Sequence, residues 1–283
     1  MAEIGTIGVV GAGTMGSGIA HVFARAGFHV LLCDVEQRLL DRALGQIRAN
    51  MLREAEKGKL APADVEPALA RIALTVNREK LAGADFAVEA ASERFDVKSE
   101  IFRALDRILP AAAILASNTS SISITKLASQ TRRPAQVIGM HFFNPVPVMA
   151  LVEVVRGMAT SEGTFATVNS LALKLGKTPV AANDAPGFVS NRVLMPLINE
   201  AAFTVMEGVA TPEAVDQIFK LGMAHPMGPL TLADFIGLDV CVDILRVLYE
   251  GFGDPKYRPC PMLVRMVDAG WLGRKTGRGF YTY

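Results

Sequence analysis

The 283-residue sequence has few cysteines, few aromatic residues and almost no net charge. Its three cysteines lie far apart and form no C-x-x-C motif. This scatter argues against a disulfide scaffold or a zinc site, and it suits a reducing compartment. Lys and Arg number 29 against 28 Asp and Glu. The balance gives no support for nucleic acid or an anionic membrane as the main partner, and no metal site is predicted.

Long apolar runs are also missing, and no leader sequence is expected. No apolar stretch approaches ~18 residues, the length that a transmembrane helix needs. The N-terminus has no basic segment ahead of an apolar one, so no signal peptide is expected. The composition, 51% hydrophobic and 20% charged, is that of a globular chain with a large core. We therefore expect a cytoplasmic enzyme that lacks membrane contacts, built as one large domain or two moderate ones.

The stretch from Ile4 to Asp34 contains the clearest pattern in the chain. A short apolar run leads into the turn Gly11-Ala12-Gly13-Thr14-Met15-Gly16, which opens an amphipathic helical pattern. A second apolar run over 29–33 then stops at Asp34. Strand, glycine turn, helix, strand and acid together form the dinucleotide-binding fingerprint. The alternative is a doubly wound domain that binds another nucleotide or none.

Each fingerprint residue has a physical role. Gly11 permits the tight turn, Gly13 lets a pyrophosphate approach the backbone, and Gly16 lets the helix pack closely. The helix N-terminus, with Thr14 and Met15, offers N–H groups to that phosphate. A carboxylate at Asp34 accepts hydrogen bonds from a ribose 2′-OH and repels a 2′-phosphate, so NAD is predicted over NADP.

Strand and helix patterns alternate as far as residue 185. We predict helices at 36–58, 62–70, 97–109 and 165–175, and strands at 72–76, 85–90, 114–118, 137–141, 151–155 and 179–182. The alternation predicts an α/β fold with a doubly wound, Rossmann-type, mostly parallel sheet that binds ligands at the carboxyl ends of its strands.

Beyond a breaker cluster at 183–187 the signals are helical. We predict helices at 188–205, 213–221, 230–250 and 261–268. The expected domains are therefore 1–185, which binds NAD, and 186–283, a smaller all-helical domain that closes the substrate cleft.

Four polar residues fall where such a fold places a site: Ser120, His141, Glu153 and Asn191. Hydride transfer from a carbinol carbon needs a group to take the hydroxyl proton, and a histidine suits that task. A carboxylate on the other ring nitrogen would orient it, and Glu153 is the obvious candidate because an apolar strand would not carry an inward glutamate without a partner. Ser120 and Asn191 can hydrogen-bond the oxygens of a substrate.

Structural explanations compete with each role. His141 could be a satisfied strand-end histidine, Glu153 could face outward, and Ser120 could be a helix N-cap. Asn191 could simply start a helix. The other histidines are attributed to packing or, for the last, to a loop: His21, His29 and His225.

Several long motifs resemble the 3-hydroxyacyl-CoA dehydrogenase family. They are the segments 117–121 (SNTSS), 139–145 (GMHFFNP), 151–154 (LVEV), 186–192 (PGFVSNR), 225–229 (HPMGP) and 273–281 (GRKTGRGFY). The resemblance extends from Ile4 to Tyr281, and the length and domain order look most like the bacterial single-function 3-hydroxybutyryl-CoA dehydrogenases. It implies reversible oxidation of a short-chain (S)-3-hydroxyacyl-CoA, with His141 as general base and Glu153 as its orienting partner.

The resemblance also implies the binding residues. To the fingerprint residues it adds four NAD contacts, Glu93, Lys98, Asn144 and Lys275, with Ser120 touching both NAD and substrate. It places coenzyme A at Asn50 and Lys57, and the acyl end near Asn144 and Asn191. Asn50 departs from the serine of some members, and Ala150 replaces a lysine that many carry. The family is usually dimeric through its helical domain. Two alternatives keep the fold: a dehydrogenase of a sugar acid, and a crystallin-like structural protein that retains NAD binding.

Overall fold

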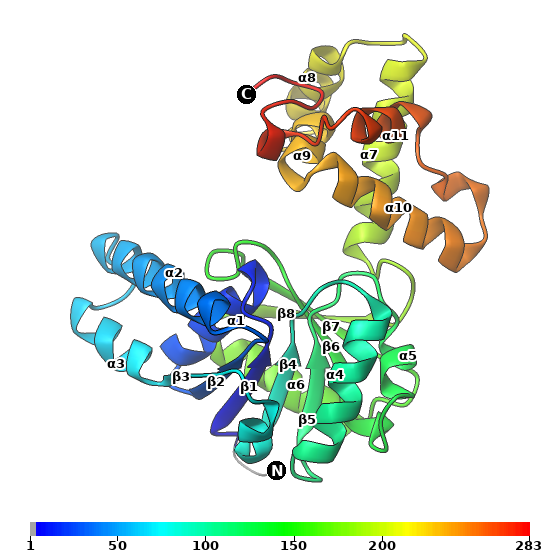
Figure 1. The fold of residues 1–283 in the computed structure, drawn as a ribbon. Helices are drawn as coiled ribbons and strands as arrows, with labels where there is room; N and C mark the ends of the chain where they lie inside the picture. The colour runs from blue at the N-terminus through cyan, green and yellow to red at the C-terminus, as the bar shows by residue number, and fades with distance from the viewer. Residues whose placement is uncertain (1–3) are drawn as a thin grey trace. The chain divides into compact units, whose positions relative to one another are not determined.

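The computed structural model describes residues 4–283. The chain forms two compact units, one ending at Asp184 and the other beginning at Ala185. Each unit has its own apolar core. In Figure 1 the first unit runs from blue to green and the second continues to red.

An eight-stranded sheet forms the centre of the first unit. Its strands are β1 (Thr6–Val10), β2 (His29–Cys33), β3 (Ile72–Thr75), β4 (Phe86–Glu89), β5 (Ile114–Ser117), β6 (Val137–Phe142), β7 (Leu151–Arg156) and β8 (Thr178–Asn183). Their order is β3-β2-β1-β4-β5-β6-β7-β8, and every pair is parallel except β6–β7. The predicted Rossmann-type, mostly parallel sheet is thus confirmed. The strand order reverses between β1 and β4, where such sheets bind their ligands.

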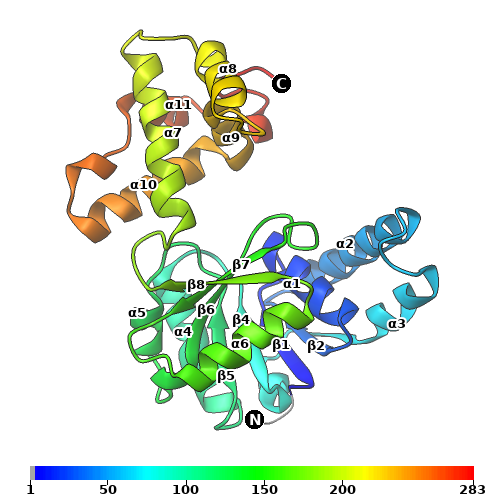
Figure 2. The same ribbon diagram turned by 180° about the vertical axis from the view of Figure 1, so that it is seen from behind.

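Helices cover both faces of this sheet. They are α1 (Thr14–Arg25), α2 (Gln37–Glu56), α3 (Val65–Ala70), α4 (Phe95–Ile108), α5 (Ile124–Ala128) and α6 (Glu162–Lys174). Figures 1 and 2 show α4 and α6 on opposite faces. The short helix α5 was not predicted from the sequence. Its N-cap is Ser123, and the Asp184 carboxylate accepts hydrogen bonds from Ser123 Oγ and from the backbone N–H groups of Ile124 and Thr125.

The second unit is helical. It contains α7 (Ser190–Met206), α8 (Pro212–Gly222), α9 (Pro229–Ile236), α10 (Leu238–Phe252) and α11 (Pro261–Asp268). The single helix predicted over 230–250 was wrong, because Gly237 adopts a φ of +107° and separates α9 from α10. A β-carbon at Gly237 would also lie 2.9 Å from Asp239 Oδ1. Across residues 4–283, none of the helices has the length and apolar character to span a bilayer.

Candidate active site

The glycine turn between β1 and α1 has the geometry of a phosphate-binding loop. Gly11 has a φ of +105°, and a β-carbon there would lie 2.5 Å from the Ala90 carbonyl oxygen. A β-carbon at Gly16 would lie 1.8 Å from the Gly11 carbonyl oxygen. At Gly13 a β-carbon would meet no described atom within 4 Å, so the approach to the backbone is open. The turn thus needs glycine at its two ends and leaves room for a ligand in the middle.

Asp34 follows β2 and is tied to this turn. Its Oδ2 accepts a hydrogen bond from the Ala12 N–H at 2.6 Å, and its Oδ1 accepts one from the Val35 N–H at 2.6 Å. The carboxylate borders a cavity of about 1020 Å³ whose walls also include Gly11, Gly13, Met15, Asn77 and Arg78. A carboxylate fixed beside the glycine turn can accept hydrogen bonds from a ribose.

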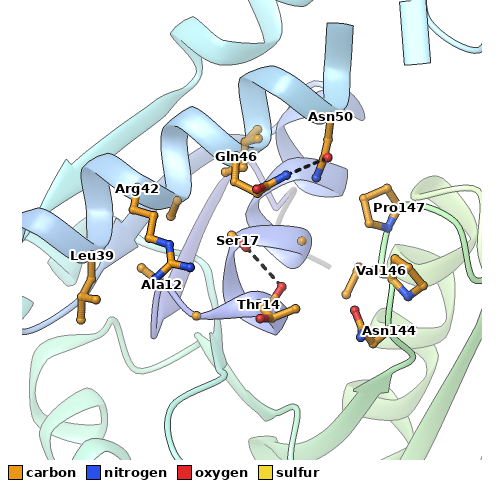
Figure 3. A pocket seen from close by; sticks show the side chains of 15 residues that line it. Ala12, Thr14, Ser17, Leu39, Arg42, Gln46, Asn50, Asn144, Val146 and Pro147 are labelled. Atoms are coloured by element: carbon orange, nitrogen blue, oxygen red, sulfur yellow. Dashed lines mark hydrogen bonds between the residues drawn. The ribbon is translucent and has the colours of Figure 1, made fainter. Parts of the chain in front are cut away.

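A second cavity, of about 340 Å³, shares Gly13, Thr14 and Leu39 with the first. Figure 3 shows α2 along one side and the 144–147 segment along the other, with the start of α1 between them. Gln46 Nε2 donates to Asn50 Oδ1 at 3.0 Å, so the two α2 side chains act as one polar group on this wall. Lys57 is exposed just beyond the end of α2, and it is not part of the cavity wall.

His141 and Glu153 face each other across the antiparallel pair β6–β7. The two residues are direct partners in the register, and His141 Nδ1 lies 2.8 Å from Glu153 Oε2. Their exposed fractions are 7% and 3%. The predicted pairing is confirmed, and the outward-facing alternative for Glu153 is wrong. Because Nδ1 faces the carboxylate, any exchange of a proton between His141 and a substrate would take place at Nε2.

Glu93 organises the turn that contains Ser120. Its Oε1 accepts hydrogen bonds from Thr119 Oγ1 at 2.5 Å, from the Ser120 N–H at 2.9 Å and from Ser121 Oγ at 3.1 Å. Partial burial alone would raise the pKa of Glu93, but the Lys98 ammonium and these bonds outweigh it and hold the pKa below its usual 4.5. The N-cap alternative for Ser120 is wrong, because Ser123 caps the helix.

Lys98 lies beneath this turn, between two carboxylates. Its Nζ is 2.7 Å from Glu89 Oε1 and 3.2 Å from Glu93 Oε2, and the side chain is 1% exposed. Glu89, fully buried at the end of β4, also accepts from Ser117 Oγ at 2.7 Å and from the Ala91 N–H at 2.7 Å. The resemblance implied a direct NAD contact for Lys98, whereas its ammonium here pairs with Glu89 and Glu93.

Sequence reasoning missed Glu89. The signal was available, since Glu89 is an acid within a predicted apolar strand, as Glu153 is. Its partner Lys98 lies nine residues later, on α4, and no sequence pattern connects the two residues. The structure therefore adds Glu89 to the residues that build the site.

The remaining predicted residues occupy three places. Asn144 is exposed in the segment that follows β6 and borders the smaller cavity. Asn191 lies in the first turn of α7, where its N–H donates to the Gly187 carbonyl at 3.1 Å. Lys275 belongs to the helical unit, and its Nζ lies 2.6 Å from the Asp239 carboxylate.

The two histidines attributed to packing differ in their burial. His21 is fully buried, as expected, and its Nε2 also lies 3.4 Å from Glu54 Oε2, which pairs with Arg25 at 3.0 Å. Burial of Glu54 would raise the pKa of its carboxyl, yet His21 and Arg25 bring that pKa below its usual value. His29 is exposed, so the packing interpretation of this residue is wrong.

In the described part of the chain, no group of three or more His, Cys, Asp or Glu is arranged to hold a metal ion.

Comparison with known proteins relates nearly the whole chain to one family. Residues 6–185 match the NAD-binding domain of 3-hydroxyacyl-CoA dehydrogenases, and residues 187–283 match the C-terminal domain of the same family. The chain is 57% identical to a probable 3-hydroxybutyryl-CoA dehydrogenase of Bacillus subtilis, over 99% of this chain and 98% of the other.

Two further comparisons agree. A probable 3-hydroxybutyryl-CoA dehydrogenase of Deinococcus radiodurans is 57% identical over 98% of this chain and 99% of its own. The crystal structure of (S)-3-hydroxybutyryl-CoA dehydrogenase from Ralstonia eutropha superposes with a TM-score of 0.96 at 50% identity, covering 99% of each chain. With the glycine turn, the acid after β2 and the two matched domains in place, the chain belongs to the 3-hydroxyacyl-CoA dehydrogenase family.

Proposed function

We propose that the protein catalyses the reversible NAD-dependent oxidation of a short-chain (S)-3-hydroxyacyl-CoA, such as 3-hydroxybutyryl-CoA, to the 3-oxoacyl-CoA. The observation that carries this proposal is the His141–Glu153 pair, at 2.8 Å, on the two strands that flank the 144–147 cavity wall. The names of the relatives support the choice of a C4 substrate.

NAD, when bound, accepts the hydride from C3 of the substrate. The protein's own residues handle the proton. His141 takes the 3-hydroxyl proton in oxidation and returns it in reduction, while Glu153 holds the ring and stabilises the imidazolium. Ser120, in the turn ordered by Glu93, hydrogen-bonds the substrate oxygen, and Asn191 is proposed as a second contact to the substrate.

Binding roles are proposed for the two cavities. We assign the larger one, with the glycine turn and Asp34, to NAD. Glu93 and Lys275, which do not line it, are proposed as further NAD contacts, and Asn144, which borders the smaller cavity, as a contact to both NAD and substrate. The smaller one, with Asn50 on α2, is assigned to the acyl-CoA, and Lys57 to the coenzyme's phosphate groups. Lys98 is assigned an indirect role through Glu93, because its ammonium lies between two carboxylates.

The test is loss of NADH absorbance when acetoacetyl-CoA is added to the purified protein. We expect rapid oxidation of NADH, and a series of 3-oxoacyl-CoA lengths should favour the shortest. NADH binding without turnover of any 3-oxoacyl-CoA would instead support the crystallin-like alternative. Turnover of a sugar acid alone would support the alternative of a sugar-acid dehydrogenase.

A homodimer and a cytoplasmic location are also proposed. The helical unit exposes apolar side chains at the end of α8: Ile218 is 56% exposed, Leu221 76% and Met223 60%. Light scattering after size exclusion should give twice the chain mass of 30.3 kDa, and Leu221→Glu should shift it toward the monomer if α8 contributes to the interface. The cytoplasmic location is supported by three free thiols, which a reducing compartment preserves.

A further inference from the structure

Lys177 is a buried lysine outside both cavities. It lies just before β8, and only 5% of it is exposed. Its Nζ donates to the Val146 carbonyl oxygen at 2.5 Å and to the Met149 carbonyl oxygen at 2.7 Å. The ammonium is thus bonded to the backbone of one segment, the loop 143–150 that joins β6 to β7.

The surroundings of Lys177 disfavour the charged form of its side chain. Burial and the positive charge of Arg25 lower the pKa of Lys177, and Glu54 acts in the opposite direction. A buried ammonium destabilises a fold unless hydrogen bonds compensate its lost hydration. Here the compensating bonds both go to loop 143–150, so the charge and the loop conformation depend on each other.

The same loop is held from its other side by α1. A β-carbon built at Gly18 would lie 2.8 Å from Val146 Cβ, so the Val146 side chain packs directly on the α1 backbone. Within the loop, the Pro145 carbonyl accepts from the N–H groups of Val148 and Met149. Val146 is therefore fixed between Lys177 and Gly18.

The fixed segment forms a wall of the smaller cavity. Residues 144–147 line it opposite Asn50, whereas Lys177 does not (Figure 3). We propose that Lys177 is a positioning residue for the acyl-CoA: it holds loop 143–150 in the conformation that shapes this wall. The inference rests on the proposed function. It predicts an effect on acyl-CoA binding that exceeds the effect on proton transfer, because the histidine ring is held separately by Glu153.

The test compares two variants. Lys177→Met keeps the length of the side chain and removes its hydrogen-bond donors. Lys174→Met is the matched control, because Lys174 is an exposed lysine at the end of α6. Hydrogen exchange should quicken at the Val148 and Met149 amides in Lys177→Met alone. The KM for acetoacetyl-CoA should rise about tenfold or more, as expected for hydrogen bonds from a charged group. The KM for NADH should stay within about twofold, and kcat should fall less than the acyl-CoA KM rises.

Three results would overturn the inference. The first two are unchanged exchange of the loop and an acyl-CoA KM equal to that of the wild type. The third is a proportional rise of the KM values for acetoacetyl-CoA and NADH, because that pattern reports general loosening. If the wild-type protein fails to turn over acetoacetyl-CoA, the proposed function fails instead, and the exchange measurement still reports on the loop.

A second variant covers the case in which Lys177→Met does not fold. Gly18→Ala pushes on Val146 from the α1 side and leaves the lysine intact. Because Gly18 itself lines the smaller cavity, the deciding measurement for this variant is exchange of the Val148 and Met149 amides. We expect faster exchange of these amides together with a rise in the acyl-CoA KM. Unchanged amide exchange in Gly18→Ala would show that the position of Val146 does not control the loop, and would likewise overturn the inference.

Discussion

His141 and Glu153 are cross-strand partners, opposite each other in the antiparallel pair β6–β7 with 2.8 Å between Nδ1 and Oε2. Because the two strands fix their separation, the pair should act as one unit. His141→Gln should lower kcat by roughly 10²–10⁴-fold, the range for a positioned general acid–base. Glu153→Gln should also lower kcat while NADH binding stays nearly normal. The double variant should be little worse than His141→Gln alone, since groups acting together are non-additive.

Steady-state kinetics of the three variants, with NADH binding by fluorescence, check this prediction. Losses that multiply in the double variant would mean that Glu153 acts on something other than His141. Near-normal turnover by His141→Gln would remove the histidine from the mechanism.

Asp34 should make the enzyme prefer NADH over NADPH. The carboxylate is fixed by the Ala12 and Val35 N–H groups, so it cannot easily swing away from a 2′-phosphate. We expect a ratio of kcat/KM well above tenfold, since tenfold is only ~1.4 kcal/mol. Asp34→Ser should shrink the ratio, and Glu36→Gln, an exposed neighbour, should leave it unchanged. Equal wild-type efficiency with NADPH would contradict this assignment.

Lys57 should contribute to acyl-CoA binding as an exposed charge. Lys57→Ala should raise the KM for acetoacetyl-CoA more than it lowers kcat, because the contact is remote from the reacting carbon. The effect should diminish at high salt, since an exposed ion pair is screened. Lys59→Ala, which removes a similarly exposed charge two residues away, is the matched control. An unchanged KM at low ionic strength would assign Lys57 to the solvated surface.

Glu93 should make stability depend on pH in the acid range. Its folded-state pKa is lower than its usual 4.5, so the charged form favours folding. That contribution is present above the unfolded-state pKa and disappears as pH falls through the folded-state pKa. Glu93→Gln should therefore cost stability at neutral pH and little at roughly pH 3.

Urea unfolding at the two pH values measures this difference. Glu100→Gln, an exposed glutamate on α4 paired with Arg78, should show a small effect at both, as surface pairs do. A Glu93→Gln deficit of equal size at both pH values would show that the charge of Glu93 is not responsible.

Much of the first unit could be predicted because its signals are local. The glycine turn, the apolar strands and Asp34 follow one another in sequence, and the structure places them as expected. The His141–Glu153 pair depended on a chemical argument, that an acid in an apolar strand needs a partner, and the β6–β7 register provides it.

Other features depend on contacts that sequence patterns do not record. The break at Gly237 was missed because the apolar period continues on both sides of it. The role of Lys177 has no sequence signal, since its partners are the backbone carbonyls of Val146 and Met149, and any residue type has a carbonyl. The role of Asp184 could not be predicted for a similar reason. Its three partners on and before α5 are two backbone N–H groups and one hydroxyl.

The segment that shapes the smaller cavity is inserted between the two strands that hold His141 and Glu153. The two strands are aligned by their own backbone ladder, in which His141 is opposite Glu153. If the smaller cavity binds the acyl-CoA as proposed, substrate preference and proton transfer depend on separate parts of one hairpin. Substitutions within residues 144–149 would then change which acyl group is accepted, while the His141–Glu153 pair stays in place.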